Sequence, residues 1–107
     1  MSDELKKARD NWHKATENLA KSMFNKVDEL KFNEDFLEFF ADIESQIKKL
    51  KASQNDIVFG IWRDKYTHEE RIKKKQEIEI IINKFSQCGK HAYKRAKSLG
   101  INSVIFC

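Results

Sequence analysis

The residues of this chain that could do chemistry begin with Cys88 and His91, which form a Cys-x-x-His pair. Such a pair can supply two of the four ligands of a zinc ion. A second pair is missing, because His13 and His68 fall at distant positions along any helical chain and only the C-terminal tail could bring Cys107 near Cys88. We therefore predict a buried Cys88, an ordinary helix-surface His91 and no metal site.

A nucleophilic enzyme is also not indicated. Ser86, Cys88 and His91 are close in sequence, but no acid accompanies them on the same helix turn. The chain has only three glycines, so neither a glycine-rich oxyanion loop nor a phosphate-cradling loop is present. Paired Glu-x-x-His motifs of the kind that hold metals in helical bundles are absent too. We predict no catalytic residues and no cofactor.

Charge placement is the strongest chemical signal. Residues 67–107 hold nine Lys or Arg against four acids, whereas the whole chain has a net charge of +4 and residues 32–56 are acidic. Basic side chains beside an aromatic ring can contact phosphates, so nucleic-acid binding is the second functional hypothesis. For the basic residues themselves, we favour the simpler interpretation of a solvated helix face. The basic-patch positions are Lys73, Lys74, Lys75, Lys90, Lys94 and Lys97, with Tyr93 at the edge.

A long central helix is predicted to organise the elements that carry these side chains. Apolar residues recur every seven positions, as is typical of a helix that packs in a bundle or coiled coil. The predicted helix covers residues 34–65, with Asn33 as its cap. The repeat consists of Phe36, Ile43, Leu50 and Ile57, and of Phe40, Ile47, Gln54 and Ile61.

Residues 53–62 allow an alternative. The polar group from Ser53 to Asp56 could end the helix, and Ile57–Trp62 could then form a buried strand. A strand needs partners, and the other strand-like run is residues 103–107, so the alternative is an α+β fold with strands near 57–62 and 103–107. We favour the continuous helix because the seven-residue repeat passes through this segment in register.

The first helix is predicted over residues 3–31. Its apolar positions recur at steps of three or four, which predicts a single buried face with Trp12 as a core anchor. These positions are Leu5, Ala8, Trp12, Ala15, Leu19, Met23, Val27 and Leu30.

The third helix is predicted over residues 67–99. Thr67 followed by Glu70 is a capping box, and Gly100 stands where a left-handed C-terminal cap is expected. Its apolar face follows the same seven-residue spacing, through Ile78, Ile82, Phe85, Gly89, Ala92, Ala96 and Leu99. Ile101–Cys107 remains as a short apolar tail.

Three helices of similar length joined by short turns predict an all-α, antiparallel three-helix bundle formed by one domain, residues 1–107. In this topology the first and third helices are parallel, so bulky residues of the first two helices meet small residues of the third. The bulky group is Phe24, Phe36, Phe39 and Phe40, and the small group is Cys88, Gly89, Ala92 and Ala96. Such complementarity is what a packed core needs.

No stretch of about 18 apolar residues is present, so we expect no membrane association and a cytoplasmic location. The function that fits best is a non-enzymatic protein-binding module, such as an adaptor, inhibitor, immunity or chaperone-like protein. Phe59, Ile72 and Ile80 lie off the apolar faces and are the expected partner-binding residues. The partner is a protein, a second copy of the chain included, unless the apolar tail folds back over them.

Overall fold

Three long helices make up the computed structural model, which describes residues 2–60 and 63–101. The first, α1, spans Ser2–Lys26 and continues as a 3-10 turn, η1, over Val27–Glu29. The second, α2, spans Asn33–Val58, and a second 3-10 turn, η2, covers Arg63–Lys65 before α3 at His68–Ser98. No strand occurs among the described residues. The prediction of an all-α three-helix fold is therefore confirmed.

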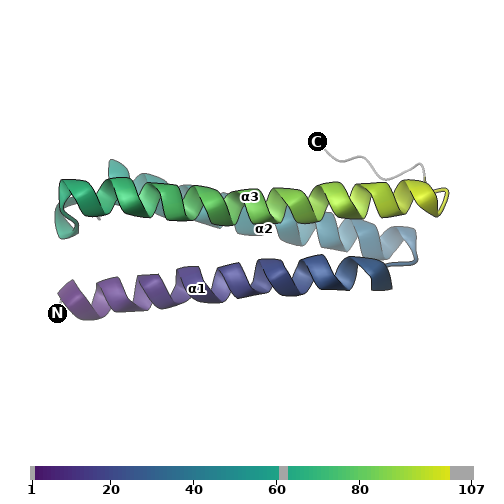
Figure 1. The fold of residues 1–107 in the computed structure, drawn as a ribbon, viewed down its shortest axis with the longest axis horizontal. Helices are drawn as coiled ribbons and strands as arrows, with labels where there is room; N and C mark the ends of the chain where they lie inside the picture. The colour runs from purple at the N-terminus through teal and green to yellow at the C-terminus, as the bar shows by residue number, and fades with distance from the viewer. Residues whose placement is uncertain (1, 61–62, 102–107) are drawn as a thin grey trace.

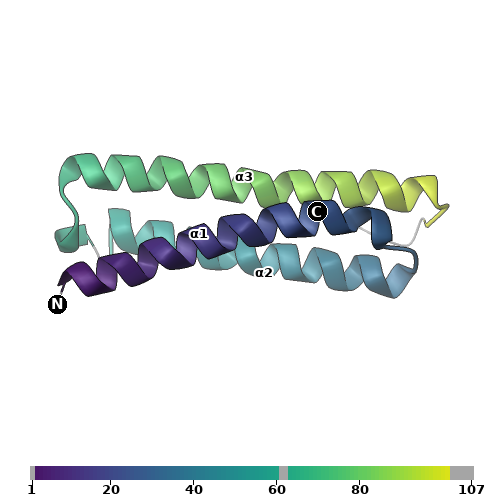
Figure 2. The same ribbon diagram turned by 60° about the horizontal axis from the view of Figure 1, so that its bottom comes forward.

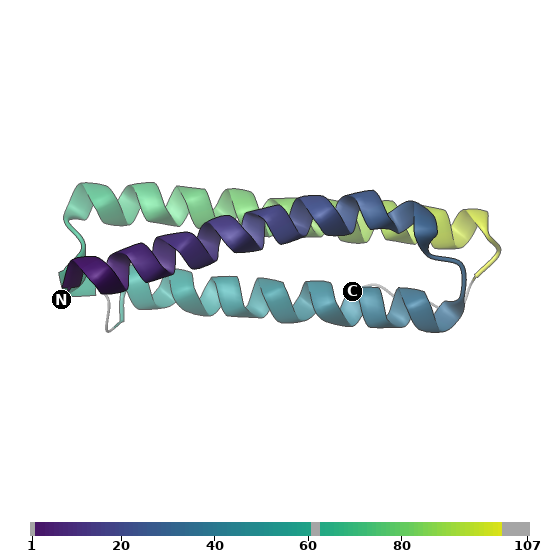
Figure 3. The ribbon, with the colours of Figure 1, turned by 90° about the horizontal axis from the view of Figure 1, so that it is seen from below.

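The helices run up, down and up along a molecule of 51 × 21 × 18 Å. Figure 1 shows α1 and α3 running in the same direction with α2 antiparallel to both, and Figure 2 shows the same arrangement after a 60° turn. The most extensive packing joins α2 to α3, and α1 also packs chiefly on α3. Figure 3 shows the N-terminal end of α1 beside the C-terminal end of α2, whereas the C-terminal half of α1 overlaps α3 in this view.

Two helix ends confirm the capping predictions. The Thr67 hydroxyl accepts a hydrogen bond from Glu70 N at 3.2 Å, and the Glu70 carboxylate accepts one from Thr67 N at 3.0 Å. Gly100 adopts φ of 77°, a conformation that side chains other than glycine rarely tolerate, and it ends α3 as expected. The cap of α2 is Phe32 rather than Asn33, and Asp35 accepts a bond from Phe32 N.

The central helix is shorter than the repeat predicted, because α2 ends at Val58 and not near residue 65. Both Phe59 N and Gly60 N donate to Asn55 O, at 2.8 and 3.0 Å, which closes the helix in a turn. A Cβ at position 60 would lie 2.9 Å from Asp56 Cα, so glycine is what lets the chain turn so tightly. The strand alternative is not supported, since residues 57–58 are helical; Ile61 and residues 103–107 lie outside the described residues.

The core forms along the seam between α2 and α3. The four α2 residues of the main repeat, Phe36, Ile43, Leu50 and Ile57, are all at most 1% exposed. On α3, Ile78, Phe85 and Ala92 are fully buried, while Leu99 is 45% exposed at the end of the helix. The predicted layer of small residues on α3 is also buried, and consists of Cys88, Gly89, Ala92 and Ala96. Phe24, which the sequence analysis placed among the bulky residues that meet these small ones, is instead 44% exposed.

The buried face of α1 differs from the predicted one. Its buried residues His13, Thr16 and Ala20 are offset by one position from the predicted stripe, which corresponds to a rotation of about 100°. Towards the C-terminal end, Met23 and Val27, the latter in η1, are buried as predicted. The predicted stripe is exposed or half-exposed at Leu5, Ala8, Trp12, Ala15 and Leu19. Trp12, expected as a core anchor, is 37% exposed.

Candidate functional site: an apolar groove between α1 and α2

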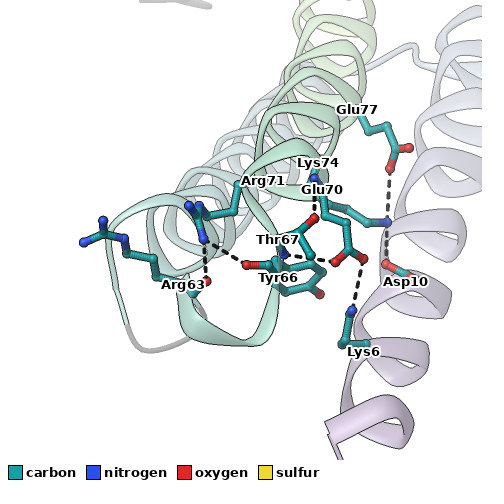
Figure 4. A network of polar contacts seen from close by, with 9 residues as sticks. All are labelled: Lys6, Asp10, Arg63, Tyr66, Thr67, Glu70, Arg71, Lys74 and Glu77. Atoms are coloured by element: carbon teal, nitrogen blue, oxygen red, sulfur yellow. Dashed lines mark hydrogen bonds and ion pairs between the residues drawn. The ribbon is translucent and has the colours of Figure 1, made fainter.

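Ion pairs hold α1 in this rotation by tying it to α3. Lys6 Nζ lies 3.0 Å from the Glu70 carboxylate, and Lys84 Nζ lies 3.3 Å from Glu17. Asp10 forms a third pair, with Lys74. Figure 4 shows the Lys6 and Asp10 side chains reaching α3 from α1. The two helices approach closely at Ala20, whose carbonyl oxygen lies 3.2 Å from Cys88 Sγ. Together these contacts turn the other apolar stripe of α1 away from α3.

Lys74 lies between two carboxylates, those of Asp10 and Glu77, as Figure 4 shows. Its side chain is only 17% exposed. Burial by itself lowers the pKa of Lys74, but the hydrogen bonds that Lys74 donates to Asp10 and Glu77 outweigh burial, so the pKa is raised. Lys74 therefore stays charged in a structural contact, and the structure separates it from the other members of the predicted basic patch.

A polar cluster links α1 to α2 beneath the exposed stripe. Arg9 Nη1 donates to Ser53 Oγ at 2.7 Å, and His13 Nε2 lies 3.1 Å from the same oxygen. His13 is 4% exposed, and burial, with the nearby charges of Lys74 and Arg9, lowers its pKa to about 4. His13 is consequently neutral at pH 7, and Ser53 can donate its hydroxyl hydrogen to Nε2.

An apolar groove of about 450 Å³ opens above this cluster, between α1 and the C-terminal half of α2. Its lining residues are Leu5, Ala8, Arg9 and Trp12 from α1, and Lys49, Ala52, Ser53 and Asp56 from α2. Leu19, 39% exposed, lies seven residues beyond Trp12 on the same face of α1, outside the groove lining. The groove thus has an apolar wall on α1 and a charged edge on α2.

The predicted partner-binding residues are all exposed, but Phe59 lies on a different element from the other two. Phe59, just after α2, is 78% exposed, while Ile72 and Ile80 on α3 are 48% and 53% exposed. Their predicted role therefore stays a prediction.

The remaining basic-patch residues divide into two groups along α3. Lys73 and Lys75 are exposed near its start, and Lys90, Lys94 and Lys97 are exposed near its end. Lys97 Nζ lies 4.8 Å from the centre of the Tyr93 ring, a cation–π distance. The lysines near the end of α3 share a face opposite the core with the aromatic ring beside them.

The Cys-x-x-His pair is used for packing. Cys88 is buried, its thiol donates to Ala20 O at 3.2 Å, and burial raises the thiol pKa. His91 stacks on Phe24 with ring centres 4.7 Å apart, and its Nε2 lies 3.8 Å from Asp28. The described residues contain no group of three or more His, Cys, Asp or Glu placed to hold a metal ion.

Comparison with known proteins finds no matching family model, no similar curated protein and no similar solved structure. Among the described residues, no helix is long and apolar enough to cross a membrane.

Sequence reasoning missed the groove because it placed Leu5, Trp12 and Leu19 in the core. A signal for it does exist in the sequence, since α1 carries two parallel stripes at the same three-and-four spacing. The hydrophobic pattern predicts that the stripe with larger apolar residues lies in the core and that the polar stripe through His13 and Thr16 lies on the surface. Only the packing on α3 reveals which stripe is buried.

Proposed function

We propose that the protein is a non-enzymatic protein-binding module that takes up a helix in the groove between α1 and α2. The observation that supports this proposal most is the half-exposed apolar stripe Leu5–Trp12–Leu19, which covers 15 residues of α1 and lines that groove at Leu5 and Trp12. Amphipathic helices dock into grooves through side chains at such spacing. Trp12 stands at the middle of the stripe, and tryptophan at the centre of an interface commonly contributes much of the binding energy.

Phe59, Ile72 and Ile80 form the other candidate protein-binding surface. Their exposure supports a role in docking, and Lys73 lies one residue from Ile72. Exposed apolar residues that are scattered singly are common on soluble proteins, however, whereas a continuous stripe beside a groove is not. The groove is therefore the first surface to test.

Nucleic-acid binding by α3 is the second candidate function. It rests on the exposed lysines Lys90, Lys94 and Lys97 with Tyr93 beside them. The ion-paired Lys74 weakens it, because the earlier cluster then has fewer free charges to offer phosphates.

Capture with matched variants tests the proposal. The wild type, a groove variant (Leu5→Lys with Leu19→Lys) and a control variant (Phe59→Ser with Ile80→Asp) are immobilised and exposed to extract from the native host. Proteins that bind the wild type and the control but not the groove variant support groove docking. Proteins lost only from the Phe59/Ile80 variant would move the site to that surface and contradict the groove.

A salt series with generic DNA and RNA tests the second candidate. Phosphate-driven binding weakens steeply as salt rises. We expect no appreciable binding even at low salt; tight binding that a Lys90→Gln, Lys94→Gln, Lys97→Gln variant abolishes would favour the nucleic-acid function instead.

A further inference from the structure

The two ends of α1 are held to the bundle in different ways. Towards the C-terminal end, apolar side chains enter the core, where Ala20 is 1% and Val27 0% exposed. Between residues 4 and 19, the buried residues are His13 and Thr16, which are both polar. We propose that residues 4–19 form a detachable strap, which opens from α2 and α3 as one unit while the rest of the bundle stays folded.

The segment that follows the strap is anchored to α3 through its backbone. Cys88 Sγ donates to Ala20 O at 3.2 Å, and Arg95 Nε donates to Leu30 O, just after η1, at 2.9 Å. Salt screens buried contacts of this kind much less than exposed charge pairs. Residues 20–30 should therefore remain docked when the strap opens.

Ion pairs hold the strap to α3. They join Lys6 to Glu70, Asp10 to Lys74 and Glu17 to Lys84. In each pair at least one side chain is more than a third exposed. Exposed ion pairs contribute little stability, and salt weakens them. Figure 4 shows the first two pairs bridging α1 and α3. These contacts can be released without disturbing the apolar core.

Open space borders the strap on both sides. The apolar groove of about 450 Å³ lies on its α2 side. A polar pocket of about 340 Å³ lies on its α3 side, lined by Asp10, His13, Lys14, Glu17, Lys74, Glu77 and Ile81. Within the described part of the chain, the buried Nδ1 of His13 has no hydrogen-bond partner, which costs stability in the docked state. The strap is therefore packed less tightly than the seam between α2 and α3.

The strap should open as one unit rather than residue by residue. Arg9 and His13 contact Ser53 of α2 at the middle of the strap, between the ion pairs made by Lys6 and Glu17. Because one helix carries all these contacts, each of them keeps the others in place. A helix of this length is marginal on its own in water, so an undocked strap also loses its backbone hydrogen bonds.

Opening changes the surface of the bundle. Leu5, Ala8 and Trp12 form the α1 wall of the groove, so the groove exists only while the strap is docked. Lys6 Nζ lies 4.9 Å from the centre of the Tyr66 ring, which is 4% exposed. The open form therefore loses the groove and uncovers Tyr66. A groove that binds no partner would leave this inference unaffected.

Residue-resolved hydrogen exchange of the full chain tests the strap. We expect the amides of residues 8–19 to share one level of protection, at least about tenfold below that of residues 40–57 in α2. Raising the salt concentration from about 0.02 to 0.5 M should speed exchange of the strap about threefold relative to α2. Protection equal to that of α2 overturns the inference, and so does protection that rises gradually from residue 8 to residue 26, as simple fraying gives.

Charge reversal tests which contacts hold the strap. Glu17→Lys places a lysine opposite Lys84 and should speed exchange of the strap about fivefold, with α2 unchanged. Adding Lys84→Glu restores a pair of opposite charges and should return exchange towards the wild-type rate. Lys94→Glu, at an exposed position near the end of α3, is the control and should leave the strap unchanged.

Three results of these variants would contradict the inference. Wild-type exchange of the strap in Glu17→Lys would mean that the ion pair does not hold it. Failure of the double variant to recover would mean that the effect does not pass through Lys84. An equal loss of protection in the strap and in α2 would mean that the bundle opens as a whole.

Discussion

The two sides of α1 differ in how they are held. Its α3 side combines small buried side chains with three ion pairs, to Glu70, Lys74 and Lys84. Its α2 side has the larger apolar residues and is joined to α2 by hydrogen-bond contacts of Arg9 and His13 with Ser53. The difference teaches that the most hydrophobic stripe of a helix need not be the one that the chain buries itself. A stripe left half-exposed is available to another molecule.

Truncating one large side chain in the core and one in the groove stripe should give the largest difference in the free energy of unfolding. Phe85 on α3 is fully buried, so Phe85→Ala should lower the free energy of unfolding by about 3–5 kcal/mol through the cavity that it leaves. Trp12→Ala removes a side chain that is 37% exposed and should cost clearly less, about 1 kcal/mol. Urea unfolding of the dilute monomer measures both. Equal losses would mean that Trp12 belongs to the core after all.

Lowering the pH should weaken the polar cluster that joins α1 to α2. The pKa of buried His13 is about 4 in the folded protein, below the ordinary 6.5. Between these values the unfolded chain binds a proton that the folded protein does not, so stability is lost as the pH falls from about 6.5 to 4. We expect a loss of about 3 kcal/mol, measured by urea unfolding across this range.

Histidine variants identify the source of that pH dependence. His13→Gln should remove most of the slope between pH 6.5 and 4, whereas His68→Gln, at an exposed position, should leave it unchanged. A slope that persists in the His13 variant would contradict the neutral, buried state of this histidine.

Ala→Leu substitutions at two positions of α1 compare its two sides through the smallest expected change in stability. Ala20, 1% exposed, faces α3, so Ala20→Leu should overpack the seam and cost about 1.5 kcal/mol. Ala15 is exposed on the groove stripe, so Ala15→Leu should change monomer stability by less than about 0.5 kcal/mol. Thermal unfolding in dilute solution compares the two. A larger stability loss for Ala15→Leu than for Ala20→Leu would mean that α1 has the rotation that the sequence predicts.

The sequence predicted the parts of the fold that local chemistry decides. The repeat through Phe36 and Leu50, the capping box at Thr67 and the turn at Gly100 are each specified by residue type and spacing, and the structure confirms them. The rotation of α1 was not predictable in the same way, because it depends on which stripe meets α3. Hydrophobicity favours Leu5 and Trp12, but close approach at Ala20 and ion pairs with α3 decide otherwise.

The C-terminal end of α2 was missed for a similar reason. The seven-residue repeat continues past Val58, although Gly60 lets the chain turn after Phe59. The apolar groove could not be predicted once the α1 stripe was assigned to the core. The ion-paired state of Lys74 could not be predicted either, because it depends on the contact with Asp10 of α1.

Acrylamide quenching of Trp12 fluorescence tests the central claim most directly. A Trp62→Phe variant leaves Trp12 as the single tryptophan, so its emission reports on the groove alone. We predict that Trp12 is readily quenched by acrylamide in the folded protein, because its side chain is 37% exposed. A Trp12 that is shielded in the folded protein would place the Leu5–Trp12–Leu19 stripe in the core and contradict the open groove.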